Sequence, residues 1–228
     1  MSLLIVSIDV GILHLGIVWA KTTTDFKLIQ FDGCDLVNLV GITRTVHERL
    51  TSPCSLSHTN TLVDRLRHFQ LFYHDLLANC HILFIEQQPM QGHTAVEQIL
   101  FDWYRDRAVL VHPRTMHKHM GFTLDMDYEK RKIGTQNILS LQPCSESFCA
   151  TYQGISTTGE RRVHDISDAA CLLLSGLMTV RKKKERENQV SKNKEISAKQ
   201  LIIAKNNKTH TNDTDLRDFL EQFRHQEN

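Results

Sequence analysis

The feature that most constrains the fold is a short, continuous apolar run at the start of the chain. Leu3–Asp9 reads LLIVSID, which is typical of a strand buried in the centre of a sheet. A tight turn containing Gly11 follows, and residues 16–21 and 26–31 then have the pattern of two further strands. Strands joined by turns this short predict a three-stranded antiparallel meander.

The middle of the chain alternates helix and strand patterns. Apolar residues recur at three- and four-residue steps over residues 61–79, which indicates an amphipathic helix. The buried strand HILFIE follows and is ended by Pro89, and a helix at 94–105 then leads to the strand AVLVHP. Strands reached through crossover helices lie parallel to their neighbours. The order predicts an α/β fold with a mixed five-stranded sheet, three antiparallel strands and then two parallel ones, with helices on both faces.

Charge is unevenly distributed and divides the chain. Residues 1–180 carry 15 Lys and Arg against 18 Asp and Glu, whereas residues 181–228 carry 12 against 8. We therefore expect one domain at 1–180 and a basic, flexible C-terminal tail at 181–228, with a short helix near Leu216 to Phe223. Other segments are expected to be helical at 115–120, 129–141 and 166–180, and irregular at 32–57 and 142–163.

Composition excludes several classes of protein. The chain has no run of about 18 apolar residues that would predict a membrane span. Because the strand pattern begins at Leu3, we expect no cleaved targeting peptide. The six cysteines form no Cys-x-x-Cys pair, and the 13 histidines have no zinc-finger spacing. These patterns predict an intracellular protein with reduced, structural cysteines.

Four acidic residues stand at the ends of predicted elements. Asp9 and Glu86 each end a strand, and parallel neighbouring strands would bring them to one carboxyl edge, where open sheets bind ligands. Asp165 and Asp168 are three residues apart at the start of an apolar helix, so they share one face. Each acid taken alone also has an ordinary explanation as a turn former or a helix cap.

Capping does not account for all four acids together. At about 4 Å and an effective dielectric constant of about 20, each like-charged pair costs about 4 kcal/mol. Divalent cations would relieve this repulsion, and oxygen ligands without a Cys or His cluster favour Mg²⁺ or Mn²⁺. Two such ions about 3.5–4 Å apart would hold the attacking and leaving oxygens of a phosphodiester. In one assignment of ligands, Asp9, Asp165 and Asp168 bind one ion, and Asp9 and Glu86 bind the other. The sequence leaves this assignment open.

The same acids carry a family resemblance. The segments SIDVGILHLGIVWA, FIEQQP and HDISDAACLL, in this order, resemble the three acidic motifs of the RNase H-like superfamily. Within it they are most similar to RuvC-type Holliday junction resolvases, in the branch of poxviruses, related large DNA viruses and fungal mitochondria. The resemblance covers residues 2–180 and leaves the tail outside. The segment 32–57 is longer than the family pattern leads us to expect.

The resemblance implies a function. Asp9, Glu86, Asp165 and Asp168 would be the catalytic metal ligands of an RNase H-like domain that uses two Mg²⁺ ions, with Mn²⁺ as a substitute. The family implies a homodimer that cuts two strands of branched, four-way junction DNA at symmetric positions, leaving 5′-phosphate and 3′-hydroxyl ends. The expected absence of a presequence favours the viral branch and a location at the site of DNA replication, in the host cytoplasm or nucleus.

Several basic and polar residues are candidates for contact with DNA or with the acids. Gln87 and Gln88 could orient Glu86 or contact DNA, and Gln88 could instead simply end its strand. His164 could relay a proton, support Asp165 or play a structural part. For the cations, phosphate contact competes with an ordinary solvated surface. The basic candidates are Lys118, Lys130, Arg131, Lys132, Arg161 and Arg162.

Three other functions are compatible with parts of the pattern. An RNase H-like nuclease acting on RNA–DNA hybrids or other branched DNA would keep the fold and change the substrate. An actin-like ATPase or sugar kinase also opens with a strand and Asp-x-Gly, but it needs a second domain for which this chain is too short. A catalytically idle DNA-architectural protein would not need all four acids.

Overall fold

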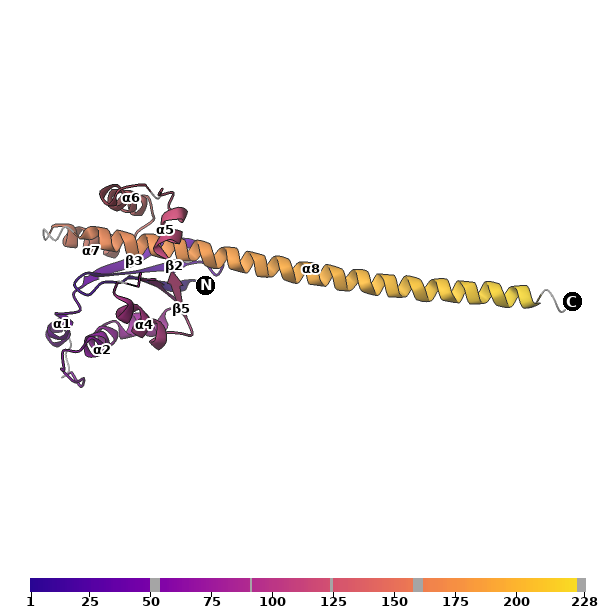
Figure 1. The fold of residues 1–228 in the computed structure, drawn as a ribbon, viewed down its shortest axis with the longest axis horizontal. Helices are drawn as coiled ribbons and strands as arrows, with labels where there is room; N and C mark the ends of the chain where they lie inside the picture. Colours follow the sequence, from indigo (N-terminus) through magenta and orange to yellow (C-terminus); the bar gives the residue numbers. More distant parts are fainter. Residues whose placement is uncertain (50–53, 91, 124, 158–161, 225–228) are drawn as a thin grey trace. The chain divides into compact units, whose positions relative to one another are not determined.

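The structure is a computed structural model in which two units are distinguished (Figure 1). The first unit is Met1–Arg181 and contains the sheet, and the second is Lys182–Asn228. The residues described are 1–49, 54–90, 92–123, 125–157 and 162–224.

Five strands form one mixed sheet in the order β3-β2-β1-β4-β5. Neighbours β1–β2 and β2–β3 are antiparallel, whereas β1–β4 and β4–β5 are parallel. This confirms the predicted meander and the parallel pairing through crossover helices. The strands are β1 (Leu3–Asp9), β2 (Leu15–Thr22), β3 (Leu28–Val37), β4 (Ile82–Glu86) and β5 (Ala108–Val111).

Helices cover both faces of this sheet, as the sequence predicts (Figure 1). Side chains alternate between the faces of a strand, so Ile8 of β1 packs with α1, α2 and α4, whereas Ile5 packs with α6, α7 and α8. The helices are α1 (Ile42–Arg49), α2 (Leu62–Phe72), α3 (His74–Asn79), α4 (Thr94–Trp103), α5 (Pro113–His119), α6 (Tyr128–Ser140), α7 (Glu146–Thr157) and α8 (Val163–Arg224).

The first part of α8 is a core helix that lies directly on the sheet. The Ser7 hydroxyl of β1 donates a hydrogen bond to the Ala169 carbonyl at 2.7 Å. A Cβ atom at Gly176 would lie 2.5 Å from the Phe84 ring of β4, so glycine allows a close approach there. Val163–Ile196 contains an 18-residue window that is apolar and long enough to cross a membrane, but 67% of that window is buried, as in the core helix of a folded domain.

Several segments differ from the sequence-based expectation. The expected helix at 61–79 is divided at Tyr73 into α2 and α3. The segment 32–57, expected to be irregular, contains the end of β3 and also α1, whose Val46 is fully buried. The expected loop at 142–163 contains α7, because Phe148 packs against Phe31 with ring centroids 5.6 Å apart.

A further expectation is corrected. The tail at 181–228 was expected to contain one short helix, but α8 is helical through Arg224. Lys, Glu and Gln are frequent there and favour helix, and Lys199 pairs with Glu195 one turn away at 2.9 Å. Flexibility of this segment stays a prediction. The spacing of Cys and His residues indicates no zinc finger, whereas side chains of both types, Cys54, His58 and His68, lie close together before and within α2.

Candidate active site

The register of the parallel strands places two acids side by side. Ile8 of β1 is registered with Ile85 of β4, and each is followed by an acid, Asp9 and Glu86, at the carboxyl end of its strand. Both side chains are partly buried. Crossover connections of the α/β type leave this sheet edge open to ligands.

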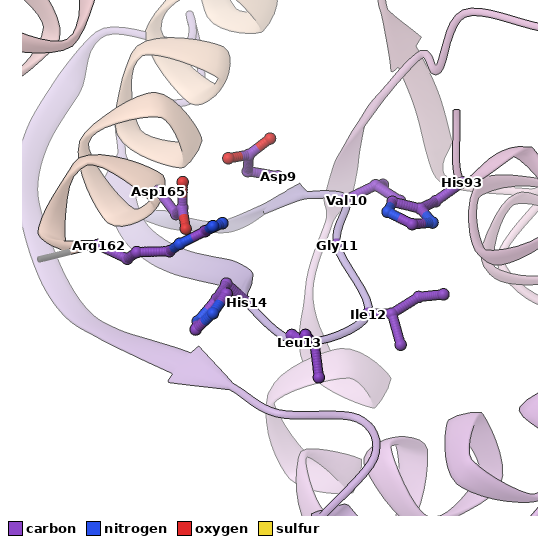
Figure 2. A pocket seen from close by; sticks show the side chains of 9 residues that line it. All are labelled: Asp9, Val10, Gly11, Ile12, Leu13, His14, His93, Arg162 and Asp165. Carbon is purple, nitrogen blue, oxygen red and sulfur yellow. The ribbon is translucent and has the colours of Figure 1, made fainter. Parts of the chain in front are cut away.

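Helix α8 adds two further acids at the same place. Asp9, Asp165 and Asp168 each offer one carboxylate oxygen that lies within 4.8 Å of the other two. Figure 2 shows the side chains of Asp9 and Asp165 on facing elements, the end of β1 and the first turn of α8. Asp168 is one turn farther along α8, as its three-residue spacing from Asp165 requires.

The closeness of these groups perturbs their protonation. Burial, and then the charges of Glu86 and Asp168, raise the pKa of Asp9 well above its ordinary value of 3.8. Burial also raises the pKa of Glu86, although a hydrogen bond with Asp9 opposes this. The hydrogen bond between Asp9 and Glu86, and the charge of Asp168 that acts on both, join Glu86 to the group of Asp9, Asp165 and Asp168.

Asp165 is the most buried member, with 7% of its surface exposed. Burial raises its pKa, whereas His164 and Lys132 lower it. Its Oδ1 lies 3.1 Å from Nε2 of His164. Its Oδ2 is buried and has no hydrogen-bond partner among the described residues, so one oxygen stays available for a ligand.

A glycine allows α8 to approach the strands at Asp165. Gly16 of β2 is registered with Asp9. A Cβ atom on Gly16 would lie 2.4 Å from the Asp165 carbonyl oxygen, well inside an ordinary contact. The absence of a side chain at this position therefore sets the distance between α8 and the strand end.

Lys132 of α6 is a cation within the acidic cluster. Its ammonium group pairs with Asp168 and lies 3.9 Å from Oδ1 of Asp165. Burial opposes its charge, but Asp168 and then Asp9 more than compensate, so the pKa of Lys132 is raised. The ammonium also lies 5.1 Å from the centre of the Tyr128 ring.

A hydrogen-bonded residue holds Glu86 from behind. The Gln88 side-chain amide donates to Glu86, and its carbonyl oxygen accepts from the His93 backbone N–H at 3.3 Å. The Gln88 backbone N–H donates to Glu97, a buried acid on α4. The orienting alternative for Gln88 agrees with these contacts. Glu97 was not among the site residues identified from the sequence. Its position on a predicted helix, next to Val96 and three residues before Leu100, places it beside apolar residues and is a signal of a buried carboxylate with a partner.

Two cavities meet at Asp9. One has a volume of about 460 Å³ and is formed by the turn after β1 together with His93, Arg162 and Asp165 (Figure 2). The other has a volume of about 160 Å³ and is lined by residues that include Glu86, Lys132 and Asp168. The carboxylates are therefore accessible from two sides.

The basic candidates differ in their relation to these cavities. Arg162 lines the larger cavity and Arg131 lines the smaller one, beside Lys132. Lys118 is exposed on α5 and lines neither.

The remaining basic candidates give no support for a phosphate contact. Lys130 is exposed and pairs with Asp127, the residue that caps α6, at 3.2 Å. The ordinary helix-surface interpretation therefore accounts for it. Arg161 lies outside the described residues.

The donor set fits hard divalent cations. All the acidic ligand atoms are carboxylate oxygens, which Mg²⁺ and Mn²⁺ prefer. The unpartnered oxygen of Asp165 and the raised pKa of Asp9 both indicate that the cluster lacks positive charge. Lys132 supplies only part of the positive charge that the four carboxylates need.

Comparison with known proteins places this site in a known fold. No protein-family profile matches the sequence, and no curated protein sequence does. Among solved structures, the yeast mitochondrial Holliday junction resolvase Ydc2 is similar with a TM-score of 0.57 at 15% identity, over 83% of each chain. The Fowlpox virus Holliday junction resolvase has a TM-score of 0.48 at 14% identity, over 78% of this chain and 99% of the other. Thermus thermophilus RuvC also has 0.48 at 14%, over 79% and 97%. The chain therefore shares the fold of the yeast mitochondrial resolvase, a mixed five-stranded sheet with helices on both faces.

Proposed function

We propose that the protein is a Mg²⁺-dependent endonuclease that cleaves four-way DNA junctions and so resolves recombination or replication intermediates. The observation that carries this proposal is the convergence of Asp9, Asp165 and Asp168, with Glu86 beside them, at the carboxyl edge of a RuvC-like sheet. A structural cap or turn former explains one such acid, but a buried cluster of like charges has a cost that a ligand must offset.

The four carboxylates would hold the cations. Asp165 contributes its unpartnered oxygen, and Gln88 keeps Glu86 directed at Asp9. Divalent cations bound here would activate water and stabilise the developing charge at a phosphodiester. No side chain of the protein needs to act as a nucleophile. Water would displace the 3′-oxygen, as the family resemblance implies, and leave 5′-phosphate and 3′-hydroxyl ends.

The basic residues around the cluster would bind the DNA backbone. Arg162 lines the larger of the two cavities that meet at Asp9, and Arg131 lines the smaller one. Lys132 also lines the smaller cavity and is the cation that pairs with Asp168. Arginine presents several donors to phosphate oxygens, and such contacts position the duplex without reading its sequence. We propose that a homodimer presents two such sites, which fits two symmetric cuts in a junction.

The decisive experiment is cleavage of a synthetic, mobile four-way junction with Mg²⁺ or with EDTA. We expect cleavage only with Mg²⁺ or Mn²⁺. Asp9→Asn and Glu86→Gln should abolish cleavage and leave junction binding in a gel-shift assay largely intact. Asp102→Asn is the matched control, because Asp102 is an exposed acid on α4 that pairs with Arg105. Full cleavage by the Asp9→Asn variant would refute the proposed role.

Substrate class needs a parallel assay. An RNA–DNA hybrid, a flap and a linear duplex should be cleaved much more slowly than the junction under the same conditions. Preferential cleavage of the hybrid would replace the proposal with an RNase H-like activity. Ligation of the junction products by a DNA ligase tests the predicted ends, and light scattering tests the dimer.

A further inference from the structure

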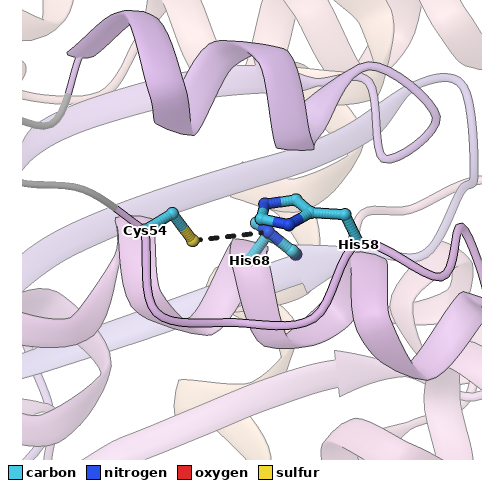
Figure 3. A group of neighbouring side chains, drawn as sticks. All are labelled: Cys54, His58 and His68. Carbon is cyan, nitrogen blue, oxygen red and sulfur yellow. Dashed lines mark hydrogen bonds between the residues drawn. The ribbon is translucent and has the colours of Figure 1, made fainter.

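A second group of metal-binding side chains lies outside the active site. Cys54 and His58 precede α2, and His68 lies on α2 (Figure 3). Each offers one ligand atom, and these atoms lie within 4.8 Å of one another. None of the three lines either cavity at Asp9. The nuclease chemistry therefore does not account for the group.

The distance between two of these side chains matches ligands that share one ion. Sγ of Cys54 lies 3.6 Å from Nε2 of His68 (Figure 3). With Zn–S near 2.3 Å and Zn–N near 2.0–2.1 Å, tetrahedral geometry places a sulfur and a nitrogen ligand about 3.6 Å apart. An S–H···N hydrogen bond gives a similar distance and the same orientation of the His68 ring, so the third side chain, His58, and the buried carboxylate of Asp64 must decide.

His68 is oriented as a metal ligand. Its ring is fully buried, and its Nδ1 lies 2.7 Å from the backbone carbonyl oxygen of Asp64. A carbonyl only accepts, so Nδ1 carries the proton and the lone pair of Nε2 is directed at Cys54. Metal-binding histidines are commonly held in this way, with the second ring nitrogen donating to a carbonyl or a carboxylate.

The surroundings of His68 favour positive charge. The Asp64 carboxylate is buried, with Oδ1 3.8 Å from Nδ1 of His68. Ser57 donates to this Oδ1 at 3.3 Å, whereas Oδ2 has no hydrogen-bond partner among the described residues. A buried carboxylate is normally paired or close to a cation. A divalent ion bound to His68 would place a positive charge near the Asp64 carboxylate.

A further histidine lies beside the group. His47 of α1 stacks on His58 with ring centroids 4.9 Å apart, and their Nε2 atoms are 3.0 Å apart. The His58 ring is in turn 5.0 Å from the His68 ring. His47 thus contacts one of the three side chains of the group.

We propose that Cys54, His58 and His68 form a structural Zn²⁺ site. A thiolate with two imidazoles suits zinc, whereas the oxygen-only cluster at Asp9 suits Mg²⁺, so ligand chemistry separates the two sites. The ion would join the segment before α2 to α2 itself, and Cys54 lies in the segment 32–57 that is longer than the family pattern leads us to expect. This inference does not depend on the proposed nuclease activity.

Metal analysis of the full-length protein tests the proposal. After purification without chelators, or after reloading with ZnCl₂ and removal of excess, we expect about one zinc per chain by mass spectrometry. His58→Gln and Cys54→Ser should each lose most of this zinc. His74→Gln and Cys149→Ser are matched controls at exposed positions and should keep it. Asp9→Asn should also keep it, which distinguishes this site from the carboxylates.

Cobalt substitution shows which side chains bind. Co²⁺ in the wild-type protein should give visible d–d bands and a thiolate charge-transfer band, and Cys54→Ser should lose the latter. Circular dichroism establishes that the variants are folded, and added Zn²⁺ should raise the melting temperature of the wild type but not of His58→Gln. A reloaded wild-type protein without zinc, or a Cys54→Ser spectrum identical to that of the wild type, would overturn the proposal.

Discussion

Replacing Gly16 by Ala tests whether the approach of α8 to the sheet places Asp165. The added Cβ would lie 2.4 Å from the Asp165 carbonyl oxygen and 2.8 Å from its carbonyl carbon. Both neighbours are backbone atoms, so no side chain can rotate away. The first turn of α8 must instead move by about 1 Å to restore an ordinary contact.

The expected effect has two parts. Overpacking costs about 1–3 kcal/mol, and the better strand propensity of Ala offsets about 0.5–1 kcal/mol. We therefore expect the free energy of unfolding to fall by about 1–2 kcal/mol. Displacement of a reacting group by about 1 Å lowers rates by about 100-fold. The activation free energy of cleavage should therefore rise by more than the free energy of unfolding falls.

Two measurements separate these effects. Urea denaturation in EDTA gives the free energy of unfolding, and initial rates of junction cleavage against Mg²⁺ concentration give activity and apparent metal affinity. Mn²⁺ binding by electron paramagnetic resonance reports the site without DNA. Gly154→Ala is the control, because a Cβ there meets nothing within 4 Å and the helix α7 should gain about 1 kcal/mol.

Unchanged Mn²⁺ binding and cleavage in the Gly16→Ala variant would refute the reasoning. If stability fell alone, Gly16 would matter for packing, but the position of Asp165 would not control the site. Equal losses in the Gly154→Ala control would show that the effect is not specific to this contact.

Three further predictions concern the charges of the site. Burial and Glu86 raise the pKa of Asp9 in the folded, metal-free protein, so folding takes up a proton at pH values between the unfolded and folded pKa. The free energy of unfolding in EDTA should therefore fall as pH rises from about 3.8 through the folded pKa, and this fall should be smaller in the Asp9→Asn variant. Lys132→Met removes the cation that pairs with Asp168 and should lower the free energy of unfolding by up to about 3 kcal/mol in EDTA. The loss should be smaller in Mg²⁺, and an equal loss under both conditions would contradict the charge argument. Gln88→Leu should weaken Mg²⁺-dependent cleavage about 10–100-fold with little loss of stability, whereas Gln87→Leu, at an exposed neighbour, should behave as the wild type.

The parts of the fold that followed from sequence are those with a strong local pattern. The apolar run of β1 and the crossover to β4 were sufficient to predict the sheet order, because strand burial and connection length restrict the pairing. Helix α7 was missed although Phe148, Tyr152 and Ile155 recur at helical spacing, since only packing against β3 makes that short stripe part of the core.

The site divides in a similar way. Asp9 and Glu86 were predicted to meet because each ends a strand of a parallel pair. The ion pair of Lys132 with Asp168 spans 36 residues, and the contact of Cys54 with His68 spans 14, and no periodic pattern joins these positions. Contacts of this kind depend on how helices are placed on the sheet.

The sequence by itself determined the five strands, the helices with a strong apolar periodicity and the acids at their ends, because hydrophobic periodicity is a property of neighbouring residues. Only the tertiary structure decided which cation enters the acidic cluster, how closely α8 approaches at Gly16, and that cysteine and histidine gather before α2. These features depend on distances between elements, which packing sets to within a fraction of an ångström and which local patterns do not encode.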